Sequence, residues 1–118
     1  MENGKCAIAT HLTNNIAFGS SEFHVIRANP SLIDNTYLFT LLNRKSVRND
    51  AEKNMTGASG HRRVPISYYE NLEIPIPPIY EQKRIVAQIE AFELEITKAR
   101  ALIDNAVSEK QTILDKYL

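Results

Sequence analysis

The chain has 118 residues, and its 14 lysines and arginines balance 14 aspartates and glutamates. Its 43% hydrophobic and 24% charged residues are ordinary for a globular protein, which argues against a disordered chain or a disulfide-rich scaffold. The length suits one domain. Because the formal net charge is zero, the sequence lacks the basic composition typical of nucleic-acid-binding domains, and any such function must depend on local charge.

The cysteine and apolar content predict the cellular location of the protein. The single Cys6 cannot form an internal disulfide, and no apolar run approaches the roughly 18 residues of a membrane span. The N-terminus also lacks the pattern of a secretory signal peptide. The sequence therefore predicts a cytoplasmic protein that does not cross a membrane. Its four glycines form neither a dinucleotide-binding nor a P-loop pattern, so no cofactor is expected.

The first part of the chain combines short apolar runs with turn residues. A helix is expected over residues 31–50, because Pro30 and Ser31 supply start chemistry and three leucines share one face. Residues 56–60 read as a loop. A brief helix is expected at residues 67–70, where Ser67 and Glu70 could form a capping box. Strand character is found at residues 6–10, 23–26, 64–66 and 72–76.

Residues 79–118 are predicted to form one long helix. After Pro77 and Pro78 the chain contains no further Gly or Pro, and Ala, Leu, Glu, Lys, Gln and Ile dominate. Glu81 falls in the first turn, where a carboxylate favours the helix dipole. The predicted fold class is therefore α+β, with a small mixed α/β portion over residues 1–78 and one long C-terminal coiled-coil helix over residues 79–118.

Apolar residues along this helix recur every three and four positions. The predicted seam comprises Ile85, Ile89, Phe92, Ile96, Ala99, Ile103, Ala106, Ile113 and Tyr117, with Lys110 as its one charged position. A helix of 38 residues is about 57 Å long, whereas a globule of 78 residues is only about 30 Å across. Much of the seam would extend past such a globule. The pattern therefore favours a partner helix, from another segment or another chain, over packing within the domain alone.

Basic residues concentrate before the prolines. Between Asn43 and Arg63, six lysines and arginines face two acidic residues, which gives this window a charge of +4. Together with hydroxyls and a glycine loop, they offer donors suited to phosphate oxygens and base edges. The candidate DNA-binding residues are Arg48, Lys53, Thr56, Ser59, His61, Arg62 and Arg63. A solvated surface with no ligand is the alternative explanation of the same composition.

The sequence gives little support for catalysis. Cys6 and the three histidines lack the close paired spacing of a zinc site, so no metal is predicted. Ser20 and Ser21 lack the strand-to-helix context of a nucleophile elbow. A nuclease or methyltransferase fragment is a third alternative, but Pro77-Pro78 lies between isoleucines and does not match the amino-methyltransferase motif.

Three ordered segments resemble the specificity subunits of type I restriction-modification enzymes. Residues 74–86, Ile-Pro-Ile-Pro-Pro-Ile-Tyr-Glu-Gln-Lys-Arg-Ile-Val, resemble the junction between a proline-rich strand and a long helix in that family. Residues 18–26 and 55–65 resemble two further segments of its target recognition domain. The similarity extends from about residue 16 to residue 118, and it implies that residues 1–78 are a partial target recognition domain and residues 79–118 a spacer helix.

The resemblance implies a non-catalytic reader of double-stranded DNA. In the family, two recognition domains each bind half of a split target, and two long antiparallel helices separate them. Modification (methyltransferase) subunits dock around these helices, and restriction subunits join the assembly. This chain contains one such helix, so its partner would be a second specificity half or a second copy in a homodimer, and a fragment or truncated product is expected. The main alternative is a coiled-coil dimerisation or assembly module that does not bind DNA on its own.

Overall fold

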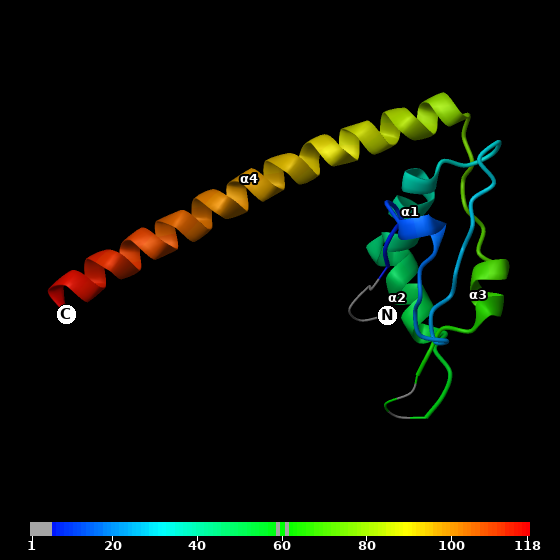
Figure 1. Cartoon of the computed structure of the whole chain (residues 1–118), viewed down its shortest axis with the longest axis horizontal. Helices are drawn as coiled ribbons and strands as arrows, with labels where there is room; N and C mark the ends of the chain where they lie inside the picture. Colours follow the sequence, from blue (N-terminus) through cyan, green and yellow to red (C-terminus); the bar gives the residue numbers. More distant parts are fainter. Residues whose placement is uncertain (1–5, 59, 61) are drawn as a thin grey trace. The chain divides into compact units, whose positions relative to one another are not determined.

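The computed structural model describes residues 6–58, 60 and 62–118. Its helices are η1 (Thr13–Asn15), α1 (Asn35–Asn43), α2 (Lys45–Lys53), α3 (Ile66–Glu70) and α4 (Ile79–Tyr117) (Figure 1). The chain divides into two compact units, here called the head unit (Met1–Lys83) and the helical unit (Arg84–Leu118). Helix α4 begins in the head unit and supplies all of the helical unit except Leu118.

Helix α4 is continuous over its 39 residues, which confirms the predicted long helix. It begins directly after Pro78, whose carbonyl oxygen accepts hydrogen bonds from the backbone N–H groups of Glu81 at 2.9 Å and Gln82 at 3.1 Å. Glu81 lies in the first turn, as predicted, and Lys116 lies in the last, so both charges favour the helix dipole. Strong helix formers and correct termini therefore account for this element locally.

Gln82 fixes the first turn of α4 to the head unit. Its side chain is fully buried. The amide Nε2 donates to the carbonyl oxygens of Leu32 at 2.9 Å and Pro77 at 2.7 Å, and Oε1 accepts from the N–H of Asp34 at 2.8 Å. A buried amide that makes all of these bonds holds the start of α4 to residues 32–34 and to Pro77, because each bond would be costly to leave unmade.

Helix α1 begins later than predicted, and its cap is Asp34. The carboxylate Oδ1 of Asp34 accepts from the N–H groups of Thr36 at 2.9 Å and Tyr37 at 3.0 Å, a regular N-cap arrangement. The predicted start at Pro30 and Ser31 is therefore wrong. Tyr37 is buried, and its hydroxyl donates to the carbonyl oxygen of Pro75 at 3.2 Å.

The predicted single helix over residues 31–50 is in fact two helices separated at Arg44. The ψ angle of Arg44 is 137°, which is not helical, and its carbonyl oxygen accepts from the N–H of Arg48 to begin α2. No Gly or Pro occurs at the break, so the residue types there give no local signal of it. After the break, Ala51 becomes fully buried, and the carbonyl oxygen of Val47 accepts a hydrogen bond from Tyr68.

Helix α3 confirms the brief helix predicted near residue 67, but its capping is different. Pro65 occupies the N-cap position, and no side chain caps the helix. The predicted capping box of Ser67 and Glu70 is therefore wrong, because Ser67 already lies inside the helix. The hydroxyl of Tyr68 reaches Val47 O at 3.2 Å and Asp50 Oδ2 at 3.0 Å, so it holds α3 against α2.

The predicted α+β class is wrong, because the described residues contain no sheet. Paired extended backbone is limited there to one antiparallel bridge between Thr56 and Arg63. Residues 6–10, 23–26 and 72–76 lie in no helix or sheet, Ile66 begins α3, and side chains bond carbonyl groups in or next to two of the four predicted strands. His24 Nε2 bonds Val64 O at 2.7 Å, Tyr37 bonds Pro75 O, and Gln82 bonds Pro77 O. A strand forms only where a neighbouring backbone completes its hydrogen bonds.

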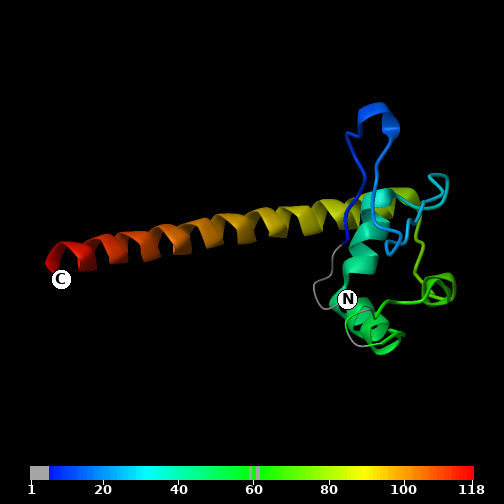
Figure 2. The same ribbon diagram turned by 60° about the horizontal axis from the view of Figure 1, so that its bottom comes forward.

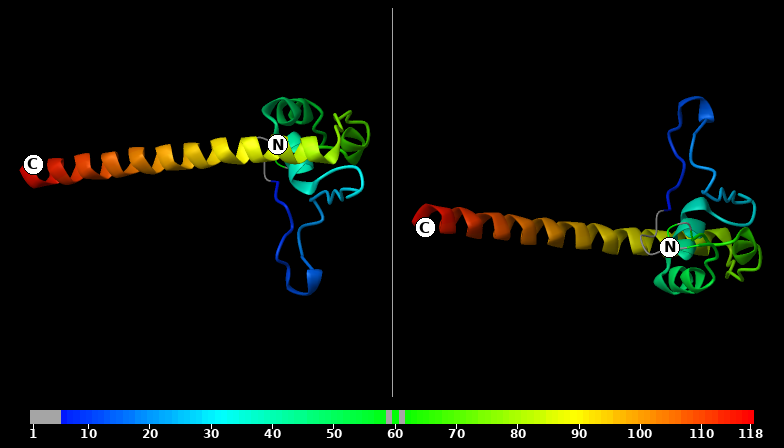
Figure 3. Two further views of the ribbon diagram at one scale, coloured as in Figure 1. Left: turned by 90° about the horizontal axis from the view of Figure 1, so that it is seen from above. Right: turned by 90° about the horizontal axis from the view of Figure 1, so that it is seen from below.

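Residues 6–32 form a long, largely irregular segment of the head unit. Figure 2 shows this segment, in blue to cyan, leaving the helices and returning, with the short η1 at its tip, and Figure 3 shows it from two further sides. Most of its apolar side chains are exposed, including Phe18 at 99%. The buried apolar residues of the head unit are Ile33, Tyr37, Leu41, Ala51 and Val64. Within the described part of the chain, no helix has the length and apolar character needed to span a bilayer.

Candidate nucleic-acid interface

The loop between α2 and α3 begins and ends at a pair of hydrogen bonds. The N–H and carbonyl groups of Thr56 and Arg63 bond each other reciprocally, both at 2.9 Å. Gly57 and Gly60 have φ angles of 116° and 88°, a region that glycine adopts far more easily than other residues. The bridge and the two glycines therefore give this segment, here called the basic loop (residues 56–63), a defined base.

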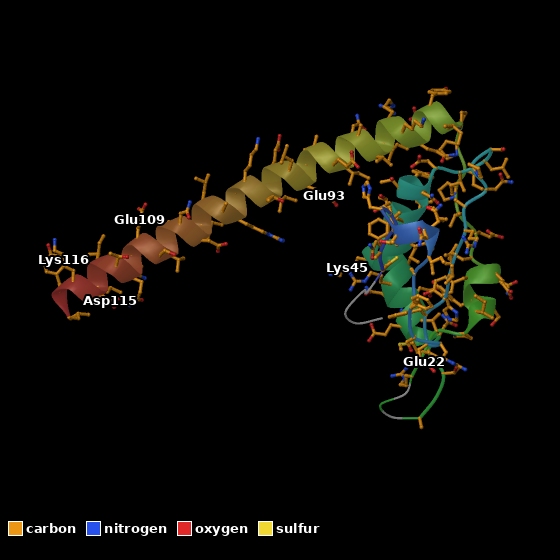
Figure 4. The ribbon with its side chains drawn as sticks, in the orientation of Figure 1. Glu22, Lys45, Glu93, Glu109, Asp115 and Lys116 are labelled. Carbon is orange, nitrogen blue, oxygen red and sulfur yellow. The ribbon has the colours of Figure 1, made fainter. Side chains whose placement is uncertain are left out.

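Two of the predicted cations lie on the basic loop. Arg62 and Arg63 are both exposed. Arg63 Nη1 lies 3.2 Å from Glu22 Oε2, and both side chains are about 60% exposed, at 60% and 63%. An exposed pair of this kind is worth at most about 1 kcal/mol, so a phosphate can replace the Glu22 carboxylate. Figure 4 shows Glu22 near the base of the loop.

Helix α2 contributes two further predicted cations, and they differ in exposure. Lys53 is exposed at the last position of α2, three residues before the basic loop. Arg48 is half-buried. Residues five positions apart on a helix are separated by about 140° around its axis. Lys53 thus lies at the end of α2 that leads into the basic loop, whereas Arg48 lies on another side of α2.

The remaining residues of the basic window are more scattered. Arg44 and Lys45 are exposed at the opposite end of α2 from Lys53, about 12 Å away along a helix of this length. Figure 4 labels Lys45 well away from the loop. Thr56 is exposed at the bridge. The predicted contacts Ser59 and His61 lie outside the described residues. The six basic residues of the window thus form no single cluster.

Tyr68 and Asp50 support the helix that carries Lys53. Burial, followed by the hydrogen bond and the negative charge of Asp50, raises the pKa of Tyr68 to about 12. The phenol is therefore protonated at neutral pH and donates to α2. Neither residue was among the sequence candidates. Glu22 was also missed, since an acidic residue 41 positions before Arg63 gives no local signal.

Helix α4 presents a second candidate surface. The predicted seam is half-buried at Ile85 and Ile89 and exposed from Phe92 onward. Phe92 is 66% exposed, Ile96 50% and Ile103 62%, and the other predicted positions, Ala99, Ala106, Ile113 and Tyr117, are exposed as well. We call this face the apolar stripe. Leu102 and Val107, next to Ile103 and Ala106, widen it and were missed because only the two central heptad positions were considered.

Metal-binding groups do not converge anywhere in the described residues, where no three His, Cys, Asp or Glu side chains could hold one ion together. Cys6 is exposed as a residue, but surrounding atoms partly cover its thiol. This partial burial raises the pKa of the thiol above the ordinary value. A raised pKa lowers the thiolate fraction at neutral pH, which disfavours a nucleophilic role.

Comparison with known proteins identifies the family of the chain. A family model described as the type I restriction modification DNA specificity domain matches residues 2–104. The chain is 38% identical to the specificity subunit of the type I restriction enzyme EcoAI from Escherichia coli, in an alignment that covers 98% of the chain and 18% of that protein. It is 36% identical to the EcoEI specificity subunit from the same organism, with the same coverage. No solved structure matches the chain significantly.

The chain therefore spans about a fifth of the length of these relatives. The family match extends through the head unit and over the first two thirds of α4, so it includes the basic loop and the apolar stripe as far as Ile103. It also agrees with the resemblance drawn from residues 18–26, 55–65 and 74–86. The chain belongs to the family of type I restriction-modification DNA specificity domains.

Proposed function

We propose that the head unit contacts double-stranded DNA through the basic loop and Lys53, as a recognition component of a type I restriction-modification system. The observation that carries this proposal is the exposed basic loop with its defined base, in a chain of the DNA specificity family. Lysines and arginines neutralise phosphates, and their release of counterions favours binding. The relatives are named as specificity subunits, which is consistent with a cytoplasmic, non-catalytic role for this chain.

The contacts divide into two classes by chemistry. Lys53, Arg62 and Arg63 carry exposed charges and contact phosphates, and the half-buried Arg48, on another side of α2, contacts a further phosphate. The polar side chains Thr56, Ser59 and His61 approach base edges. Phosphate contacts set the position of the protein, whereas base contacts set sequence preference. Arg63 exchanges its surface pair with Glu22 for a phosphate oxygen when DNA binds.

The apolar stripe of α4 packs against a second long helix. A row of exposed Ile and Phe side chains over about five turns is larger than the apolar patches that monomers usually leave in water. Modification subunits dock around the resulting helix pair, and restriction subunits join the same assembly. The second helix comes from the other half of a specificity subunit or from a second copy of this chain.

Salt dependence tests the DNA proposal. With four phosphates neutralised, the logarithm of affinity for duplex DNA falls against the logarithm of salt concentration with a slope of about −3.6. Replacement of Arg62 and Arg63 together by Ala weakens binding and makes that slope shallower by up to about two. Replacement of Lys98 and Lys116, which lie on α4, is the matched control and leaves the slope unchanged. An unchanged slope in the double arginine variant would reject the phosphate assignments.

An assembly module without DNA binding is the second candidate function, and the exposed apolar stripe favours it. In that case the head unit only supports the start of α4 through Gln82, and the basic residues form a solvated surface. Electrophoretic shift on duplex DNA, with sedimentation in parallel, separates the two functions. Salt-sensitive DNA binding supports the reader, whereas self-association with no DNA binding supports the module.

A further inference from the structure

The backbone that follows the basic loop is held by a histidine from a distant part of the chain. His24 Nε2 lies 2.7 Å from the carbonyl oxygen of Val64, 40 residues later in the sequence. Because a carbonyl oxygen can only accept a hydrogen bond, Nε2 carries a proton and donates it. Val64 directly follows Arg63, and its side chain is buried, at 5% exposure. The bond therefore fixes the peptide group next to one end of the basic loop.

The ring of His24 is itself placed by helix α3. It meets Tyr69 edge to face, with ring centroids 5.6 Å apart and an interplanar angle of 65°. Tyr68 meets Tyr69 in the same way at 5.3 Å, and its hydroxyl bonds Val47 O and Asp50 on α2. Edge-to-face rings attract each other beyond the area that they bury. A continuous set of contacts thus connects α2, α3 and His24 to the end of the basic loop.

Two residues of one short segment reach consecutive residues at this end of the loop. Glu22 pairs with Arg63, and His24 bonds Val64. The segment turns at Ser20, whose hydroxyl oxygen accepts a hydrogen bond from the N–H of Glu22 at 3.2 Å. Figure 4 shows Glu22 near the base of the loop. The two contacts differ in kind, because Glu22 occupies the arginine side chain, whereas His24 bonds only the backbone.

We propose that His24 is a positioning residue for DNA binding, which keeps the end of the basic loop in place while Arg63 exchanges Glu22 for a phosphate. The inference rests on the proposed DNA contact of the head unit. It adds a residue that acts through the loop arginines and does not touch DNA itself.

The division of roles follows from the chemistry of the two contacts. The pair of Glu22 and Arg63 is exposed on both sides, so its loss costs little. The bond from His24 to Val64 O leaves the arginine side chain free, and it stays intact when the arginine turns to a phosphate. A loop that is already held in place needs less ordering when its ligand arrives, and the saved entropy favours binding.

Affinity for duplex DNA in the full chain tests this role. H24F keeps a ring against Tyr69 but lacks the donor, and it is expected to weaken binding about threefold to fivefold. H24Q supplies an amide donor of similar reach and should restore the affinity to within about twofold of the original. In the R62A/R63A background, H24F should change the affinity by less than about 1.5-fold, because a residue that acts through these arginines has no effect without them.

Y37F is the matched control for a general loss of stability. It also removes one side-chain bond to a carbonyl oxygen of the head unit, from the Tyr37 hydroxyl to Pro75 O at 3.2 Å. It should leave DNA affinity and its salt dependence unchanged. Weakening by Y37F equal to that by H24F would assign the effect to stability and overturn the proposal. An undiminished effect of H24F without the two arginines would show that His24 contacts DNA directly, which would also overturn it.

Amide hydrogen exchange measures the positioning without DNA. The N–H groups of Thr56 and Arg63 form the two bonds of the loop base. In H24F their exchange is expected to be about fivefold faster, because the loop base opens more often, while the amides of α1 keep their rates. Unchanged rates at Thr56 and Arg63 would overturn the positioning role. A wild-type chain without salt-sensitive DNA binding would instead overturn the proposed function, whatever the exchange rates show of His24.

Discussion

The head unit and the helical unit are stabilised by interactions of different sequence range. In the helical unit, side-chain hydrogen bonds are local, such as Thr97 to Glu93 and Gln111 to Asp115, each four residues apart. In the head unit, Gln82 bonds Asp34 over 48 residues and Tyr37 bonds Pro75 over 38. The helix therefore tolerates the loss of any one bond, whereas the head unit depends on a few polar side chains that join distant segments.

The largest expected effect comes from removing the most connected of these anchors. Replacement of Gln82 by Ala leaves Leu32 O, Pro77 O and the N–H of Asp34 without their partners in a buried place. We expect a loss of about 3 kcal/mol in the free energy of unfolding, because each buried group left unpaired costs about 1–3 kcal/mol. Urea unfolding of the full chain, followed by tyrosine fluorescence, measures this loss.

Gln88 on the same helix provides the control for that prediction. It is exposed, so its replacement by Ala should change the free energy of unfolding by less than about 0.5 kcal/mol. Far-ultraviolet circular dichroism should show that most helix signal persists in both variants. Equal losses in the two variants would contradict the contrast between long-range anchors and a locally stabilised helix.

Replacement of Tyr68 is expected to have a smaller effect on the free energy of unfolding, and this effect should depend on pH. Replacement by Phe removes the hydroxyl bonds to Val47 O and Asp50, and is expected to cost about 1 kcal/mol at neutral pH. Burial and Asp50 raise the pKa of Tyr68 from 10.0 to about 12 in the folded chain. The unfolded chain therefore loses this proton first. The stability that the hydroxyl contributes is fully present below pH 10 and is lost as the pH rises through about 12.

The measurement is the difference in unfolding free energy between the wild-type chain and Y68F across this range of pH. It should stay constant from neutral pH to about pH 10 and shrink between pH 10 and 12. Y80F is the matched control, because Tyr80 is 74% exposed. A difference that grows above pH 10, or an equal response in Y80F, would show that Asp50 does not hold the Tyr68 proton.

The same contrast explains how far the fold could be predicted from the sequence. Helix α4 follows from composition, from the prolines before it and from Glu81 in its first turn, all of which are local. The break at Arg44 has no Gly or Pro as a local signal, and beyond it Ala51 is fully buried. The strand predictions failed for a related reason. Apolar alternation indicates that one face of a segment is buried, but it does not identify which groups will bond its backbone.

The candidate site shows the same limit. The glycines and arginines of the basic loop identified the segment, because turn residues and charge are visible in sequence. The window of +4 nevertheless overstated the cluster, because α2 separates Arg44 and Lys45 from Lys53. The acid at Glu22, which pairs with Arg63, comes from a segment 41 residues earlier. Local charge therefore locates a surface, whereas only the fold determines which charges share it.

The smallest expected effect concerns that pair. Replacement of Glu22 by Gln removes an exposed ion pair and should change the free energy of unfolding by less than about 0.5 kcal/mol. If Arg63 contacts a phosphate, loss of the competing carboxylate should raise affinity for duplex DNA about two- to threefold at low salt, and high salt should erase the gain. E70Q, at an exposed acid of α3, changes the net charge equally and controls for the general effect. A gain of the same size in both variants would assign the effect to net charge, whereas a gain confined to E22Q would place the phosphate at Arg63.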